Sequence, residues 1–158
     1  MQNDPLRPKP DPNVYLGFDY GTRNIGVAVG RRDTSMAMPL ETVCAIKERT
    51  NWPAISRLVE EWQPAGIVVG LSRQEDGSEN SVTQPILKFC RQLKGRYGLP
   101  VFQVDEFLST RASRQLLYDD LNLGRKKLLA VQDRVAAQLI LQSWFESTRL
   151  RAGTDDPS

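Results

Sequence analysis

Histidine is absent from this sequence of 158 residues. Its absence excludes Ser-His-Asp and Cys-His catalysis, zinc sites of the H-E-x-x-H type and acid-base chemistry at an imidazole. Any reaction that the chain catalyses must therefore use carboxylates, hydroxyls, lysine or arginine, or a hard metal ion.

Cysteine is scarce as well, with Cys44 and Cys90 as the only two. Their spacing is not that of metal ligands and both lie in apolar stretches, so we expect two reduced, buried thiols of a cytoplasmic protein. Long hydrophobic runs are also missing. No segment approaches the roughly 20 apolar residues that cross a bilayer, and the polar, proline-rich start does not have the pattern of a secretory signal, so we expect no membrane partner.

The composition that remains is typical of an ordinary folded domain. Hydrophobic residues make up 40% and charged residues 25% of the chain, and the net charge is +2. A chain of this length can form one domain with a full core but hardly two. Four prolines predict a flexible segment at residues 1–13, the polar end predicts a flexible tail at 150–158, and the domain should span 14–149.

Hydrophobic patterns predict the order of the elements. Residues 14–18 and 25–29 flank a turn and predict an antiparallel hairpin, and residues 37–46 predict a third strand at an edge. The remaining segments predict two βα crossovers and a mixed sheet with helices on both faces. They are a helix from Asn51 to Pro64, a strand at 66–71, a helix at 81–97, a strand at 101–104, a helix capped by Ser109 or Thr110, an exposed basic loop at 123–129, and a final helix at 132–149.

Asp19 ends the first predicted strand, where an unpaired carboxylate would be costly to bury. It could accept hydrogen bonds from the backbone of the turn, as aspartate does at many strand ends. It could instead bind a metal ion or face a phosphate, with Gly21 and Gly26 allowing another group to approach the backbone.

Other acidic residues are expected at the same edge of the sheet, because ligands of open α/β sheets gather at the carboxyl ends of the strands. Glu106 follows the last strand and Asp133 begins the final helix. Together with Asp19 they could hold one or two Mg²⁺ ions, as in two-metal sites that cleave phosphodiesters. Taken alone, Asp133 could merely complement the helix dipole, and Asp105 rather than Glu106 could be the inward carboxylate.

Several of these segments together resemble the YqgF family of pre-16S rRNA nucleases, also described as Holliday junction resolvases, with a RuvC-type, ribonuclease H-like fold. The matching motifs are L-G-F-D-Y-G-T at 16–22 with I-G-V-A-V at 25–29, I-V-V-G-L at 67–71 with D-G-S-E at 76–79, V-D-E at 104–106 with L-S-T at 108–110 and Ala112, and Asp133 with A-A at 136–137 and I-L-Q-S at 140–143. They occur in the family's order.

The resemblance implies a five-stranded ribonuclease H-like sheet and a metal-dependent endonuclease that processes the 5′ end of the small-subunit rRNA precursor. It implies Asp19, Glu106 and Asp133 as the catalytic and metal-binding triad, with Mg²⁺ or Mn²⁺ as the cofactor. Three positions depart from the family's pattern: Phe107 replaces an arginine, Ser72 a proline and Asn24 a basic residue. We therefore expect altered substrate contacts.

Basic residues in or beside the loops expected near this edge could bind phosphates in a salt-dependent, largely sequence-independent way. Individually, such residues are more often ordinary solvated surface. They are Arg23, Arg73, Arg111, Arg114, Arg125, Lys126 and Lys127.

Two alternatives to the rRNA nuclease stay open. The protein could resolve four-way DNA junctions, although resolvases that cut symmetrically are usually dimers and we expect a monomer or weak dimer. It could also be a non-catalytic nucleic-acid binding module in transcription or ribosome assembly. Actin-like and sugar-kinase ATPases, which also begin with a D-x-G hairpin, need two such domains and do not fit this length.

Overall fold

The structure is a computed structural model that describes residues 11–21, 23–72, 81–106 and 125–154. Within these ranges, the side chains of residues 72, 106, 125–133 and 150–154 are not described.

A mixed five-stranded sheet forms the centre of the molecule, with the strand order β3-β2-β1-β4-β5. Strand β2 pairs antiparallel with both β1 and β3, whereas β4 is parallel to both β1 and β5. The predicted hairpin, edge strand and parallel crossovers are confirmed. The strands are β1 (Val14–Asp19), β2 (Asn24–Arg31), β3 (Met36–Cys44), β4 (Gly66–Ser72) and β5 (Val101–Glu106).

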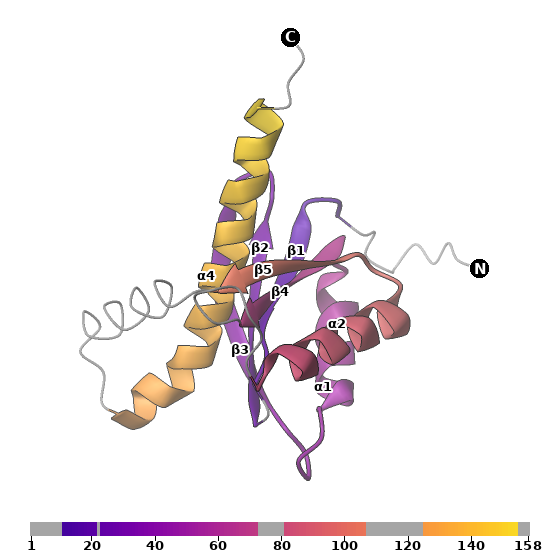
Figure 1. Ribbon diagram of the computed structural model, residues 1–158, viewed down its shortest axis with the longest axis vertical. Helices are drawn as coiled ribbons and strands as arrows, with labels where there is room; N and C mark the ends of the chain where they lie inside the picture. Colours follow the sequence, from indigo (N-terminus) through magenta and orange to yellow (C-terminus); the bar gives the residue numbers. More distant parts are fainter. Residues whose placement is uncertain (1–10, 22, 73–80, 107–124, 155–158) are drawn as a thin grey trace.

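Helices cover both faces of the sheet, as predicted (Figure 1). Helices α1 (Trp52–Trp62) and α2 (Thr83–Tyr97) pack on one face, and α4 (Arg125–Thr154) crosses the other. The helix predicted after Thr110 lies outside the described residues. None of the helices in the described part of the chain is both long and apolar enough to span a bilayer.

Alternation along the central strands divides the core into two layers. In β1, Leu16 and Phe18 pack toward α1 and α2, whereas Tyr15 packs toward α4. In β4, Val68 belongs to the α4 layer and its neighbours Ile67 and Val69 to the other layer. These strands are apolar on both sides because both faces of the sheet are buried.

Helix α1 begins as the sequence predicts. The Asn51 side chain accepts a hydrogen bond from the Ala54 backbone N–H at 3.2 Å, and Pro53 lies in the first turn. The helix ends at Trp62, just before Pro64.

Helix α4 begins earlier than the sequence predicts. The predicted basic loop at 123–129 is wrong from Arg125 onward, because that residue starts α4, which runs without interruption to Thr154. The segment after Gly124 contains no helix breaker before Gly153, and its charged and leucine residues are good helix formers. The basic residues therefore stand on the first turn of a helix rather than in a loop.

The expectation of two buried thiols is half right. Cys90 is buried in α2, whereas Cys44 is exposed. Cys44 is the last residue of β3, which is an edge strand, and none of the described helices covers this end of the strand.

Candidate functional site

The carboxyl ends of β1, β4 and β5 share one edge of the sheet because these three strands are parallel. Asp19 is the last residue of β1 and Glu106 the last residue of β5. Phe18 pairs with Val69 and Ser72 pairs with Glu106, so Glu106 stands two residues further along the strand direction than Asp19. With strands about 4.8 Å apart and about 3.3 Å per residue, the two Cα atoms are separated by roughly 12 Å.

Asp19 is half-buried at the start of the β1–β2 turn. This turn requires glycine at position 21, because a Cβ there would lie 2.5 Å from the Asn24 carbonyl oxygen. The tight turn places Asp19 opposite Gly26 and carries Arg23, which is exposed, to the same edge.

The side of β1 that Asp19 occupies is the side covered by α4. Asp19 follows Tyr15 and Gly17 at intervals of two residues, so the three lie on one side of the strand. The Tyr15 ring lies 4.9 Å from that of Trp144, and a Cβ on Gly17 would lie 2.9 Å from Leu141 Cβ.

Helix α4 therefore runs antiparallel to β1. Moving along β1 from Tyr15 to Gly17, the facing helix residues change from Trp144 to Leu141 and the Ala137 carbonyl. A step of two residues along a strand covers about 6.6 Å, and a step of four residues along a helix covers about 6 Å. The step from Gly17 to Asp19 along β1 therefore corresponds to one more turn toward the start of α4, the turn that contains position 133.

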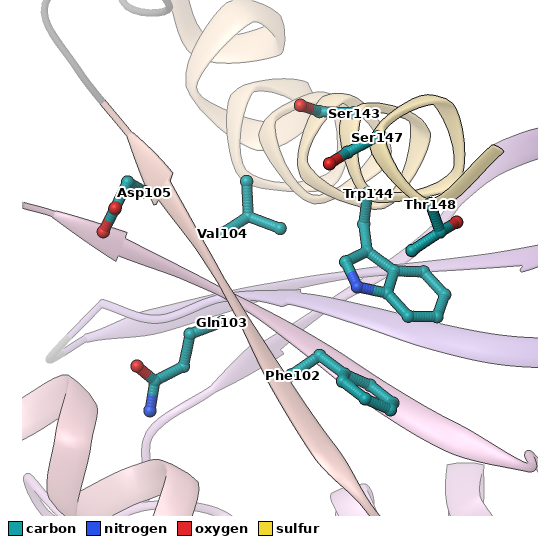
Figure 2. A pocket seen from close by; sticks show the side chains of 8 residues that line it. All are labelled: Phe102, Gln103, Val104, Asp105, Ser143, Trp144, Ser147 and Thr148. Atoms are coloured by element: carbon teal, nitrogen blue, oxygen red, sulfur yellow. The ribbon is translucent and has the colours of Figure 1, made fainter. Parts of the chain in front are cut away.

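Asp105 lies on the other side of the sheet from Asp19. It alternates with Val104, which packs in the α4 layer, and shares its side of β5 with Gln103, which hydrogen-bonds the Cys90 thiol in α2. Figure 2 shows Val104 pointing toward α4 and Gln103 pointing away from it. The position of Glu106, by the same alternation, belongs to the α4 side.

Metal ligands are not assembled among the side chains that the structure describes: no three of these Asp, Glu or Cys groups lie close enough together to hold an ion. Of the predicted triad, only Asp19 has a described side chain, since those of Glu106 and Asp133 fall outside this set.

The predicted phosphate-binding residues fall into two groups. Arg23 is at the carboxyl edge, and Arg125, Lys126 and Lys127 are on the first turn of α4, about 9 to 12 Å beyond position 133 along the helix. The others, Arg73, Arg111 and Arg114, lie outside the described residues.

A cavity of about 320 Å³ lies beside β5, against the later turns of α4 (Figure 2). Phe102 and Trp144 line it with their rings 4.8 Å apart, together with hydroxyls such as that of Ser147. Its one ionisable lining residue is Asp105, and no basic residue lines it. Among the lining residues, this cavity therefore has no positive charge to balance that of a phosphate.

Two glutamines position α4, and we did not identify them from the sequence. Gln138 donates to the Ala37 carbonyl at 3.1 Å, and Gln142 accepts from the Ala37 N–H at 3.1 Å and donates to the Ser35 carbonyl. Their side chains satisfy backbone groups of Ala37 in β3 and of Ser35, which immediately precedes this strand. The signal was present, since two glutamines four residues apart interrupt an otherwise apolar helix face.

Comparison with known proteins identifies the family. A family model described as "RuvX: Holliday junction resolvase" matches residues 13–147. The chain belongs to the RuvX (YqgF) family. This confirms the resemblance noted in the sequence.

RuvX-family relatives match most of the chain. A Methylococcus capsulatus protein named "Putative pre-16S rRNA nuclease" is 56% identical over 132 residues, which cover 84% of this chain and 87% of the relative. A Methylobacillus flagellatus protein of the same name is 47% identical over 131 residues, covering 83% and 89%.

Solved structures share the fold of this RuvX protein. The fowlpox virus Holliday junction resolvase matches with a TM-score of 0.54 over 85% of this chain and 99% of that chain, at 15% identity. At this identity the match shows the fold alone. The predicted ribonuclease H-like class is confirmed.

Proposed function

We propose that this RuvX protein is a divalent-metal-dependent endonuclease that hydrolyses a phosphodiester bond in the precursor of 16S rRNA, in the cytoplasm. The names of its relatives support the substrate. The observation that supports the proposal is the antiparallel path of α4 over β1, with Trp144 against Tyr15 and Leu141 against Gly17. Continued by one helical turn, this path would bring Asp133 level with Asp19.

The donor set fits a hard cation. We propose Asp19, Glu106 and Asp133 as ligands, because their positions share the α4 side of one edge and carboxylate oxygens are the ligands that Mg²⁺ and Mn²⁺ accept. Bound there, Mg²⁺ or Mn²⁺ would activate the attacking water and stabilise the leaving oxygen. Asp105 is a poor candidate because Gln103, on the same side of β5, is directed toward α2.

The packing of α4 on β1 would hold the ligands in place, and basic residues would bind the phosphates of the substrate. Close packing of α4 on Gly17 fixes the helix against β1, so that the ligands need little rearrangement. Arg23 and the first turn of α4, with Arg125, Lys126 and Lys127, would bind the phosphates on either side of the scissile bond. We also propose Arg73, Arg111 and Arg114 for this role. Binding through such contacts weakens steeply as salt increases.

A second candidate substrate is four-way junction DNA, which the description of the matching family model favours. Symmetric resolution requires two active sites related by a two-fold axis, hence a dimer. We propose a monomer or weak dimer, so RNA is the better match. Molar mass in solution at the concentration of the cleavage assay distinguishes the two arrangements.

The test compares precursor 16S rRNA with a four-way DNA junction, each with Mg²⁺, with Mn²⁺ and with excess chelator. We expect metal-dependent cleavage of the RNA and its loss in Asp19→Asn. Faster cleavage of the junction would transfer the assignment to DNA. Absence of cleavage of either substrate, with RNA still bound, would instead indicate a non-catalytic binding module.

A further inference from the structure

Helix α2 is unusually rich in positive charge. Its fifteen residues include Lys88, Arg91, Lys94 and Arg96 and no acidic residue. All four side chains are exposed, and none takes part in the ion pairs found among the described residues, which involve Arg31 and Arg57 only. Within the described part of the chain, these charges are therefore not used in ion pairs.

The basic residues lie away from the core. Ile86, Phe89 and Leu93 are buried against the sheet, whereas Lys88 and Arg91 fall near the opposite side of the helix at 100° per residue. Lys94 lies beside this line, and the Arg96 guanidinium lies 4.1 Å from the centroid of the Trp52 ring. This stacking orders Arg96 while its charge stays exposed.

Gly95 lies in the middle of these charges, and nothing within the described fold requires glycine there. A Cβ at this position would meet no atom within 4 Å, and its φ is not positive. Glycine within a helix is unfavourable compared with alanine. An open backbone surrounded by cations suits the close approach of a partner that carries phosphates.

We propose that the basic face of α2, formed by Lys88, Arg91 and Lys94 around Gly95 and extended by Arg96 on the other flank of the helix, binds the phosphate backbone of RNA that flanks the cleavage site. This inference rests on the proposed nuclease function and extends its binding surface. Phosphate contacts of this kind fix the position of the RNA and do not read its sequence.

The place of α2 in the fold suits this role. The helix follows the carboxyl end of β4 and leads back to the amino end of β5, so it runs from the catalytic edge across the face opposite α4 (Figure 1). From Lys88 to Arg96 the helix advances about 12 Å. RNA leaving the edge on this side would therefore meet a row of cations.

The experiment measures RNA binding in the Asp19→Asn background, so that cleavage does not interfere. Precursor 16S rRNA fragments are titrated by fluorescence anisotropy at several salt concentrations. We expect Lys88→Gln/Arg91→Gln to raise Kd at least about fivefold and to reduce the slope of log K against log salt by about 1.4 to 1.8, the value for two lost phosphate contacts.

The matched control is Arg32→Gln/Arg149→Gln, which removes two exposed charges at the opposite edge on the α4 side. Its Kd and salt slope should not change. If the α2 variant binds like the control, the inference is wrong, while metal-dependent cleavage by the protein with Asp19 intact would still support the proposed function.

Gly95→Leu separates the stability of α2 from its binding of RNA. Because the site is open and helical, this variant should have a higher Tm, yet it should bind RNA at least about twofold more weakly because the side chain obstructs the phosphates. Unchanged or tighter RNA binding would contradict close approach at Gly95.

Discussion

Gly17 sets how closely α4 lies over the central strand. A Cβ at this position would stand 2.9 Å from Leu141 Cβ and 3.1 Å from the Ala137 carbonyl oxygen. Neither atom can move without displacing the helix, so this one residue determines the spacing between the two elements that carry Asp19 and Asp133.

Gly17→Ala should destabilise the protein by about 1–3 kcal/mol, the usual range for overpacking a core. Urea unfolding at pH 7 measures this. Gly95→Ala serves as the control, because the same change in open helical space should stabilise by about 0.5–1 kcal/mol. Equal effects at the two sites would show that α4 does not pack on Gly17.

The two cysteines differ in reactivity because they differ in burial. Burial raises the pKa of the Cys90 thiol to about 11, partly offset by the hydrogen bond with Gln103. At pH 8 only about one thousandth of such a thiol is ionised, and the thiolate is the reactive form.

We expect one thiol to react rapidly with a disulfide reagent at pH 8 and the second to react only after unfolding. Mass spectrometry should find the fast label on Cys44, which is exposed. Rapid labelling of Cys90 in the folded protein would contradict its buried position.

At the scale of elements, local patterns predicted most of the sheet. The two apolar runs around Gly21, the continuous apolar strand β4 and the Asn51-capped α1 each carry their own signal, and the structure confirms them. The start of α4 had no such signal, because a lysine- and arginine-rich segment suits both a loop and a helix surface. Cys44 was predicted to be buried because its neighbours are apolar, but apolar residues in an edge strand need not be covered by a helix.

The attachment of α4 to the edge strand depends on side-chain amides. Gln142→Ala should destabilise by about 1–3 kcal/mol, because it leaves the Ala37 N–H and the Ser35 carbonyl without this partner. Thermal or urea unfolding measures the loss. Ser143→Ala, at the exposed neighbouring position, should change stability by less than about 0.5 kcal/mol. A Gln142 variant as stable as this control would show that the amide contacts contribute nothing.

At the scale of the whole molecule, the sheet separates two layers of the core, and the proposed functional residues stand at one of its edges. The sequence predicted that Asp19, Glu106 and Asp133 would meet there, from strand ends and helix order alone. The strand pattern alone left Asp105 and Glu106 as alternatives, because neighbouring strand residues face opposite layers, and Glu106 was implied only by the resemblance to the family. The packing of Val104 and Gln103 shows which side of β5 faces α4. The choice of the α4 side is the central claim of the proposed mechanism.

Comparing Glu106→Gln with Asp105→Asn in the metal-dependent cleavage assay tests this claim most directly. A ligand that supports several kcal/mol of metal-assisted stabilisation corresponds to a rate loss of about 100-fold or more, so Glu106→Gln should lose at least that much. Asp105→Asn, which removes the same charge one residue earlier, should retain activity within about threefold. If Asp105→Asn is inactive and Glu106→Gln cleaves normally, the active site is not on the α4 side of the sheet.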